Sequence, residues 1–392
     1  MLNTPFSPWP SFTEEEANAV RDVVLSNKVN YWTGQECREF EKEFAAWAGT
    51  AHAVALTNGT VALDLALKAF DIGPGDEVIV TPRTFLASVS SIVNAGAVPI
   101  FAEVDRDTQN ITAETIQSVL TPRTRGIICV HLAGWPCDMD PIMELASLHG
   151  LKVIEDCAQA HGARYKGRAV GSIGHIGAWS FCQDKIMTTG GEGGMVTTND
   201  RDLWLKMWSY KDHGKSWNAI YEREHQPGFR WLHESFGTNW RMLELQAVVG
   251  RIQLRRMQEW HDSRIRNAER IWSHARELKG LRVPDVPEDH VHAAYKCYVF
   301  VEPQQLKSDW NRDRIIAEIN ALGVPCFSGS CSEVYLEKAF DDTGWRPEVR
   351  LPVAKELGET SLMFLVHPTL TDMEIQKTCE VMRIVLQQAC KC

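Results

Sequence analysis

The stretch HAVALTNGTVALDLALKAF, residues 52–70, joins a short apolar run to a helical pattern. Residues 52–57 form a continuous apolar run of strand length, whereas residues 59–70 carry apolar side chains at helical spacing. Apolar strands separated by helices are typical of a parallel sheet that is covered on both faces. The stretch therefore predicts an α/β fold.

The same alternation continues as far as residue 156. Apolar runs bounded by turn residues are separated by helical segments, which repeats the strand and helix unit of the first stretch. The expected strands are residues 77–82, 98–105, 126–131 and 151–156, and the expected helices are residues 84–96, 112–120 and 141–150.

The flanking segments predict further helices and a second domain. Thr13 and Glu16 form a capping box before a helix, and the helical pattern of residues 37–49 ends at Gly49. A long helix is expected over residues 244–280, long enough to leave one domain and enter another. We expect a large domain over residues 1–265 and a smaller α+β domain over residues 266–392, with strands near 296–303 and 361–368.

Composition excludes several classes of protein. The 392 residues are 44% hydrophobic and 23% charged, with a net charge of −10 and no dense basic block, so nucleic acid is not an expected partner. The chain shows neither a leader pattern nor a long apolar run, which favours a cytoplasmic protein without a membrane segment. The eleven cysteines have no metal-ligand spacing, so reduced thiols and no metal are expected.

Polar residues follow the expected strands at the edge where ligands collect in open α/β sheets. Such residues are Asn58-Gly59-Thr60, Arg83-Thr84-Phe85, His131, and Asp156 with Gln159. A candidate site therefore lies at the carboxyl ends of the strands.

The stretch SFCQDKIMTTGGEGG, residues 180–194, adds one lysine, Lys185, among hydroxylic and glycine residues. A Walker phosphate loop is excluded, because Ser209 stands where the first glycine before Gly214-Lys215 is required. No dinucleotide-binding glycine pattern follows any strand. A covalent role with pyridoxal phosphate requires a carboxylate for the ring nitrogen and a helix start for the phosphate.

Candidates for both of these groups, and for an aromatic ring beside the cofactor, follow the expected strands. A carboxylate is available at Asp156, a helix start at Gly59-Thr60 and an aromatic face at Phe85. Two alternatives stay open at this point: Asp156 is equally compatible with a helix cap, and Phe85 with a core position.

Four long motifs resemble the DegT/DnrJ/StrS family of pyridoxal-phosphate-dependent sugar aminotransferases, which has the aspartate aminotransferase fold. The resemblance covers nearly the whole chain. The motifs are TNGTVALDLALKAFDIGPGDEVIVTPRTFLAS, IEDCAQAHGA, SFCQDKIMTTGGEGG and GTNWRMLELQAVVGRIQL. One departure is an extra glycine after Lys185, in KIMTTGGEGG, which suggests a different path for that loop.

The resemblance implies a role for each matching residue. Lys185 would form the Schiff base with pyridoxal phosphate, Asp156 would meet the pyridine nitrogen, and Gln159 the phenolate edge of the ring. Phe85 would stack on the ring. The phosphate would be bound by Gly59, Thr60, Ser180 and, from the neighbouring subunit of a homodimer, Asn239.

The implied reaction moves an amino group from glutamate to a nucleotide-linked keto-sugar through pyridoxamine phosphate, for polysaccharide or related glycan biosynthesis. Candidate substrate contacts are Arg241, Lys211, His213 and His161; Arg241 is equally compatible with bridging helices and His161 with a structural role. A sugar dehydratase of the same family is one alternative, but in that branch a histidine replaces the lysine. A regulator or sensor that retains the fold is another.

Overall fold

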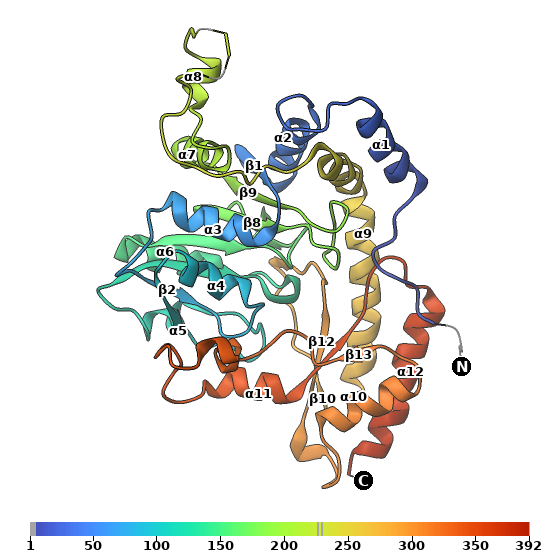
Figure 1. The fold of residues 1–392 in the computed structure, drawn as a ribbon. Helices are drawn as coiled ribbons and strands as arrows, with labels where there is room; N and C mark the ends of the chain where they lie inside the picture. The colour runs from blue at the N-terminus through green and yellow to red at the C-terminus, as the bar shows by residue number, and fades with distance from the viewer. Residues whose placement is uncertain (1–4, 226, 229, 392) are drawn as a thin grey trace.

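The computed structural model describes residues 5–225, 227, 228 and 230–391. Its central element is a seven-stranded sheet with the strand order β1-β9-β8-β5-β4-β2-β3 (Figure 1). Of these strands, β9 runs antiparallel to both neighbours, and the other pairings are parallel. The strands are β1 His52–Leu56, β2 Glu77–Val80, β3 Val98–Phe101, β4 Thr124–Val130, β5 Lys152–Asp156, β8 Ile176–Ser180 and β9 Gly194–Thr198.

The five strands expected from the apolar runs are confirmed, as is the α/β class. The sequence patterns do not predict β8 and β9, which contain glycines and lie between β1 and β5. These two strands complete the sheet and bring the end of β8 close to the start of the first sheet-covering helix, α3.

Helices cover both faces of the sheet, as the alternation predicts (Figure 1). Along β1, Val54 and Leu56 point into the core that α3 covers, whereas Ala53 and Ala55 point toward α2 and α9. The helices of this part are α1 Glu14–Leu25, α2 Glu36–Ala48, α3 Gly59–Ala69, α4 Ala87–Asn94, α5 Ala113–Gln117, α6 Met139–His149, α7 Arg201–Lys211, α8 Trp217–Tyr221 and α9 Glu244–Arg276.

The predicted ends of the first two helices are also confirmed. The backbone N–H of Thr13 donates to Glu16 Oε2 at 2.7 Å, which is one half of the capping box. Gly49 ends α2 in the left-handed conformation, with φ of 68°.

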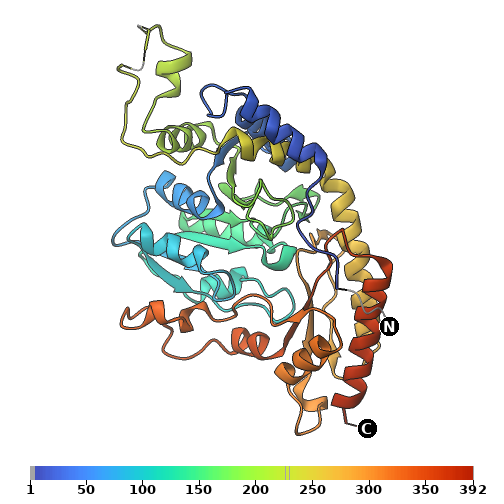
Figure 2. The same ribbon diagram turned by 45° about the vertical axis from the view of Figure 1, so that its right-hand side comes forward.

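The 33-residue helix α9 passes from one hydrophobic core to another (Figure 2). Ala247 and Met257 pack against the sheet core, whereas Ala268 and Ile271 pack in a second core under a four-stranded antiparallel sheet. The domain boundary expected near residue 265 lies between these two sets and stays a prediction. The second sheet contains β10 Leu281–Arg282, β12 Cys297–Val301, β13 Cys326–Phe327 and β14 Ser361–Phe364, with helices α10 Arg312–Ala321, α11 Pro352–Thr360 and α12 Asp372–Ala389.

Two peripheral features complete the fold. A small three-stranded sheet is formed by β6 Arg164–Tyr165, β7 Arg168–Ala169 and β11 His290–Val291. Helix α8 stands away from the body of the molecule (Figure 1). Within the described ranges, no helix combines the length and apolar character needed to cross a membrane.

Candidate active site

The start of α3 and the end of β8 meet at one point. Asn58 caps α3, because its Oδ1 accepts a hydrogen bond from the backbone N–H of Val61 at 3.0 Å. A Cβ atom added to Gly59 would lie only 2.5 Å from Ser180 Cβ, so glycine is required for this approach. The first N–H groups of a helix lack intrahelical acceptors and carry partial positive charge. Gly59, Thr60 and Ser180 therefore fit a phosphate group.

Asp156 lies at the carboxyl end of β5 and is 5% exposed. Ser88 donates its hydroxyl hydrogen to Asp156 Oδ2 at 2.8 Å, and Ala158 N–H donates to Oδ1 at 3.1 Å. Burial raises the pKa of Asp156, while these two bonds and the positive charge of Lys185 act against that rise. A buried carboxylate held at both oxygens fits a partner for the protonated nitrogen of a pyridine ring.

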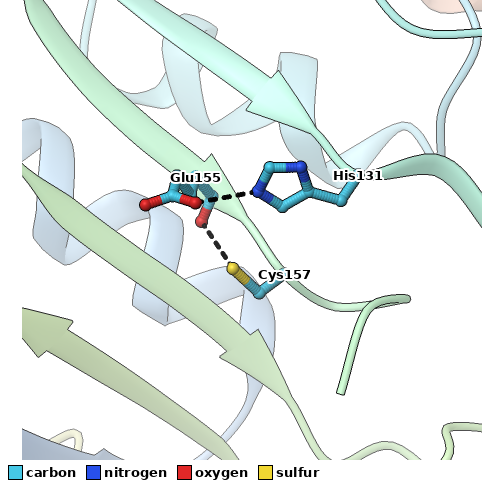
Figure 3. Close-up of side chains that lie close together, drawn as sticks. All are labelled: His131, Glu155 and Cys157. Carbon is cyan, nitrogen blue, oxygen red and sulfur yellow. Dashed lines mark hydrogen bonds and ion pairs between the residues drawn. The ribbon is translucent and has the colours of Figure 1, made fainter. Parts of the chain in front are cut away.

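The neighbouring residue, Glu155, is expected on the opposite side of β5, because successive side chains of a strand alternate between its faces. Figure 3 shows Glu155 next to His131 and Cys157. Its carboxylate accepts hydrogen bonds from His131 Nε2 at 3.0 Å and from the backbone N–H groups of Gly171, Ile173 and Gly174. Burial acts to raise the pKa of Glu155, but His131 and these N–H groups outweigh it and hold the pKa below its usual range. The polar side-chain atoms of Glu155 and His131 are all hydrogen-bonded within the chain, which favours a structural role for this pair.

Lys185 follows β8 and presents its amine in a partly enclosed position, with 16% of the side chain exposed. Its Nζ lies 3.6 Å from Asp184 Oδ2 and 3.5 Å from the hydroxyl of Tyr295. The Tyr295 hydroxyl in turn donates to Asp184. Both distances are longer than a normal hydrogen bond, so neither group binds the amine tightly.

Tyr295 and Asp184 are site residues that the sequence reasoning missed. Burial raises the pKa of Tyr295, and the nearby Asp184 carboxylate adds to this, so the phenol keeps its proton. Burial acts to raise the pKa of Asp184, but Lys185 and Tyr295 more than offset it and keep the pKa low. Asp184 stands next to Lys185, which was a usable signal. Tyr295 is 110 residues away from Lys185, just before β12, and no sequence pattern indicates that it reaches the site.

Gln159 and Phe85 both follow strands at the carboxyl-end edge of the sheet, and their contacts leave polar and aromatic groups available there. Gln159 Oε1 accepts from the N–H of Ala133 at 2.9 Å, which leaves its amide nitrogen as a donor. Phe85 follows β2 and is 71% exposed, so it is not a core residue. The alternative that Phe85 fills the core is thereby ruled out.

The glycine-rich loop after Lys185 forms the turn between β8 and β9. Gly190 and Gly191 have φ of 84° and 119°, in the region that side chains rarely adopt. Gly194 begins β9, and a Cβ there would lie 2.2 Å from the Asn58 carbonyl oxygen. The additional glycine is thus one of two consecutive residues with positive φ.

Two of the four candidate substrate contacts form ion pairs within the chain. Lys211 is fully buried and its Nζ lies 2.9 Å from Glu41 Oε1, while Arg241 Nη1 lies 2.6 Å from Asp212 Oδ1. These pairs neutralise both cations within the chain, and the geometry favours the structural alternative for Arg241. The substrate roles of Lys211 and Arg241 stay predictions without support from the contacts.

The two histidines differ in environment. His161 is fully buried between Trp179 and Phe181, behind β8, and burial lowers its pKa to about 3, with Lys185 and Arg264 adding to the effect. Burial favours a structural role, but neither ring nitrogen has a hydrogen-bond partner among the described residues, so the alternative of a hydrogen-bonded structural histidine is not supported by the contacts. His213 is exposed and has φ of 60°, at the end of α7. Its substrate role stays a prediction.

Asn239 lies in an extended segment that crosses the edge of the sheet. It pairs with Asp212 through backbone contacts, and the adjacent Trp240 accepts a bond from Thr57 N–H at 3.1 Å. The Asn239 residue is exposed, and the same segment exposes Trp231 and Phe236, 87% and 100%. The residue is therefore free to face another molecule.

A mainly parallel sheet with a lysine, a buried aspartate and a helix start at one edge fits a pyridoxal-phosphate-dependent enzyme of the aspartate aminotransferase fold. The chain belongs to the DegT/DnrJ/EryC1/StrS aminotransferase family, whose sequence profile matches residues 10–383. It is an aminotransferase, and its cofactor is pyridoxal phosphate.

Three relatives cover nearly the full chain. The crystal structure of an aminotransferase from Psychrobacter cryohalolentis is 67% identical, with a TM-score of 0.96 and coverage of 98% of this chain and 99% of that one. GDP-perosamine synthase of Caulobacter vibrioides is 38% identical and covers 93% of this chain and 95% of its own. UDP-N-acetyl-3-dehydro-alpha-D-glucosamine 3-aminotransferase of Acidithiobacillus ferrooxidans is 36% identical, with coverage of 94% and 95%.

Proposed function

We propose that this enzyme transfers the amino group of glutamate to a nucleotide-linked keto-sugar, with Lys185 as the reactive amine. The observation that carries the proposal is that the Lys185 amine lies close enough to the buried Asp156 carboxyl for its charge to lower the pKa of that carboxyl, while its contacts to Asp184 and Tyr295 are long. Two relatives have names that specify a GDP-linked and a UDP-linked amino-sugar product or substrate. They support a sugar nucleotide as the acceptor class, in the biosynthesis of a polysaccharide or related glycan.

Each residue has a defined task in this proposal. Gly59, Thr60 and Ser180 bind the phosphate, Asp156 holds the proton on the ring nitrogen, and Gln159 and Phe85 hold the edge and face of the ring. Pyridoxal phosphate, when bound, supplies an electron-withdrawing ring that carries the amino group from donor to acceptor.

The Lys185 amine acts as the base. Its Nζ takes a proton from the α-carbon of the donor, and in the second half of the reaction it returns a proton to the sugar carbon that receives the amino group. The Tyr295 hydroxyl and the Asp184 carboxylate attract the freed amine electrostatically, because they lie 3.5 and 3.6 Å from Nζ.

The proposal includes a homodimer in which Asn239 completes the phosphate site of the partner. Its support is the exposure of Asn239 together with the exposed aromatic residues Trp231 and Phe236 of the same segment, since interfaces are enriched in aromatic residues. We place the reaction in the cytoplasm, the compartment that favours the free thiols found at the ten described cysteines.

One experiment tests the reactive lysine and a second tests the substrate. Borohydride treatment of the loaded enzyme, followed by peptide mass spectrometry, is expected to find the cofactor attached at Lys185, and attachment elsewhere would refute the assignment. With glutamate as donor and a panel of UDP-, GDP- and dTDP-keto-sugars, mass spectrometry is expected to find an amino-sugar nucleotide. Reaction only with free keto acids would refute the substrate class.

A further inference from the structure

The N-terminal segment, residues 5–12, lies against the C-terminal part of the chain, and we name it the N-terminal strap. It runs from α1 along α9 toward α12 (Figures 1 and 2). Ser7 N–H donates to Glu374 Oε1 at 2.5 Å, and the Thr369 hydroxyl donates to the Pro8 carbonyl at 2.7 Å. Phe6 packs against the second hydrophobic core. These contacts attach the N-terminal strap to the C-terminal part of the chain.

Trp9 connects this strap to the reactive lysine. Its indole Nε1–H donates to the backbone carbonyl oxygen of Lys185 at 2.9 Å. The ring is held in place by His367, stacked at 6.0 Å between centroids, and by Trp260, edge-on at 5.1 Å. The orientation of the N–H group is thus determined by packing, not by chance rotation of a surface side chain.

The guanidinium of Arg264 contacts the face of the Trp9 ring, which favours an aromatic side chain at position 9. Its guanidinium carbon lies 5.0 Å from the centroid of the Trp9 ring, and the residue is 2% exposed. Among the described residues, its Nε and Nη2 have no hydrogen-bond partner. The face of the ring therefore supplies a favourable contact to a buried cation, which makes Phe a better test substitution than Ala.

We propose that Trp9 is a positioning residue for Lys185. During transamination the lysine side chain must leave the cofactor and move a proton, whereas its Cα must stay in place. A bond to the Lys185 carbonyl holds the backbone and leaves Nζ free, and the Lys185 N–H is held at the same time by the Cys182 carbonyl at 3.1 Å. This inference rests on the proposed role of Lys185 as the reactive amine.

The test compares Trp9→Phe with the control Trp260→Phe. Both variants replace one indole of the same aromatic contact, but only Trp9→Phe removes the bond to Lys185. We expect Trp9→Phe to raise hydrogen–deuterium exchange in the peptide containing residues 182–189 about tenfold and to lower kcat about tenfold, with KM for glutamate changed less than about twofold. Trp260→Phe is expected to match the wild type in both measurements.

Two further measurements make the outcomes distinct. If Trp9→Phe exchanges and turns over as Trp260→Phe does, the positioning role is wrong, even where borohydride still fixes the cofactor at Lys185. If borohydride fixes the wild-type cofactor at another residue, the proposed function itself fails. Should Trp9→Phe not fold, 3-benzothienylalanine incorporated at position 9 keeps the bicyclic ring but lacks the N–H group, and wild-type exchange at residues 182–189 in that protein overturns the inference.

Discussion

The active-site edge of the sheet and the segment of residues 211–241 use charged groups in opposite ways. Asp212 is closely paired: its Oδ1 lies 2.8 Å from Lys215 Nζ and 2.6 Å from Arg241 Nη1, and its Oδ2 accepts from Trp32 at 2.8 Å. By contrast, the polar contacts of the Lys185 amine with the described residues are longer, at 3.5 Å to the Tyr295 hydroxyl and 3.6 Å to Asp184 Oδ2. The charge of Asp212 is thus neutralised by close partners within the chain, whereas the proposed reactive amine has no close partner among the described residues.

Asp156→Ala gives the largest expected effect and tests the active-site side of this comparison. Removing a preorganised charge from the site is expected to lower kcat by about 10²- to 10³-fold while the fold persists. Steady-state kinetics at measured cofactor occupancy checks this. Wild-type turnover with full occupancy would remove Asp156 from the proposed mechanism.

Gly59→Ala tests whether the cradle at α3 needs its close approach to Ser180. Because the new Cβ would lie 2.5 Å from Ser180 Cβ, the helix start must shift away from the phosphate position. We expect cofactor affinity to fall about a hundredfold, which is the loss of two charge-assisted hydrogen bonds. Gly73→Ala is the matched control, since its Cβ would make an ordinary 3.6 Å contact. Equal cofactor affinity in the two variants would exclude the cradle.

Asp212→Asn tests the opposite side of the comparison. The change leaves the buried cations near Asp212 without their carboxylate, and a loss of about 2 kcal/mol in the free energy of unfolding is expected. Urea unfolding measures the loss, and kcat per folded molecule is expected to stay within about twofold. A large fall in kcat with unchanged stability would show that this segment takes part in the chemistry.

His161→Leu tests how much the buried His161 contributes to the loss of stability at acidic pH. The folded pKa of His161 is lowered from 6.5 to about 3, so the unfolded chain binds a proton between these values that the native chain does not. The native state therefore loses stability as pH falls from 6.5 toward 3, by at most about 2 kcal/mol between pH 6.5 and 5. In His161→Leu the difference in unfolding free energy between pH 7 and pH 5 is expected to shrink. An unchanged difference would place His161 in contact with solvent.

The sequence predicts the parts of this molecule that depend on local patterns. The apolar runs locate β1 to β5, and the strand-end residues Gly59, Asp156 and Gln159 lie at one edge of the sheet, as the parallel topology requires. Resemblance to the family adds the expected roles of Lys185, Phe85, Ser180 and Asn239, which stay predictions. The confirmed strands share a cause, because each depends on residues close together in the chain.

The features that the sequence does not predict depend on contacts between distant residues. β9 lies between β1 and β8 only because it pairs antiparallel with both, and no local pattern states this order. Tyr295 reaches Lys185 from the segment before β12, and Trp9 reaches it from the N-terminus. Lys211 and Arg241 look like free cations in the sequence because Glu41 and Asp212, which neutralise them, become visible as partners only in three dimensions.

The opposite orientation of Glu155 and Asp156 limits how the active site can change during evolution or redesign. A one-residue insertion or deletion in β5 would exchange the two carboxylates, and it would break the bonds of Glu155 to His131 and to the loop at residues 171–174. The length of β5 is therefore constrained by the hydrogen bonds of Glu155, on the face opposite to Asp156. Changes that adjust the acidity of Asp156 without this penalty belong at Ser88, whose hydroxyl contacts the carboxylate from another element.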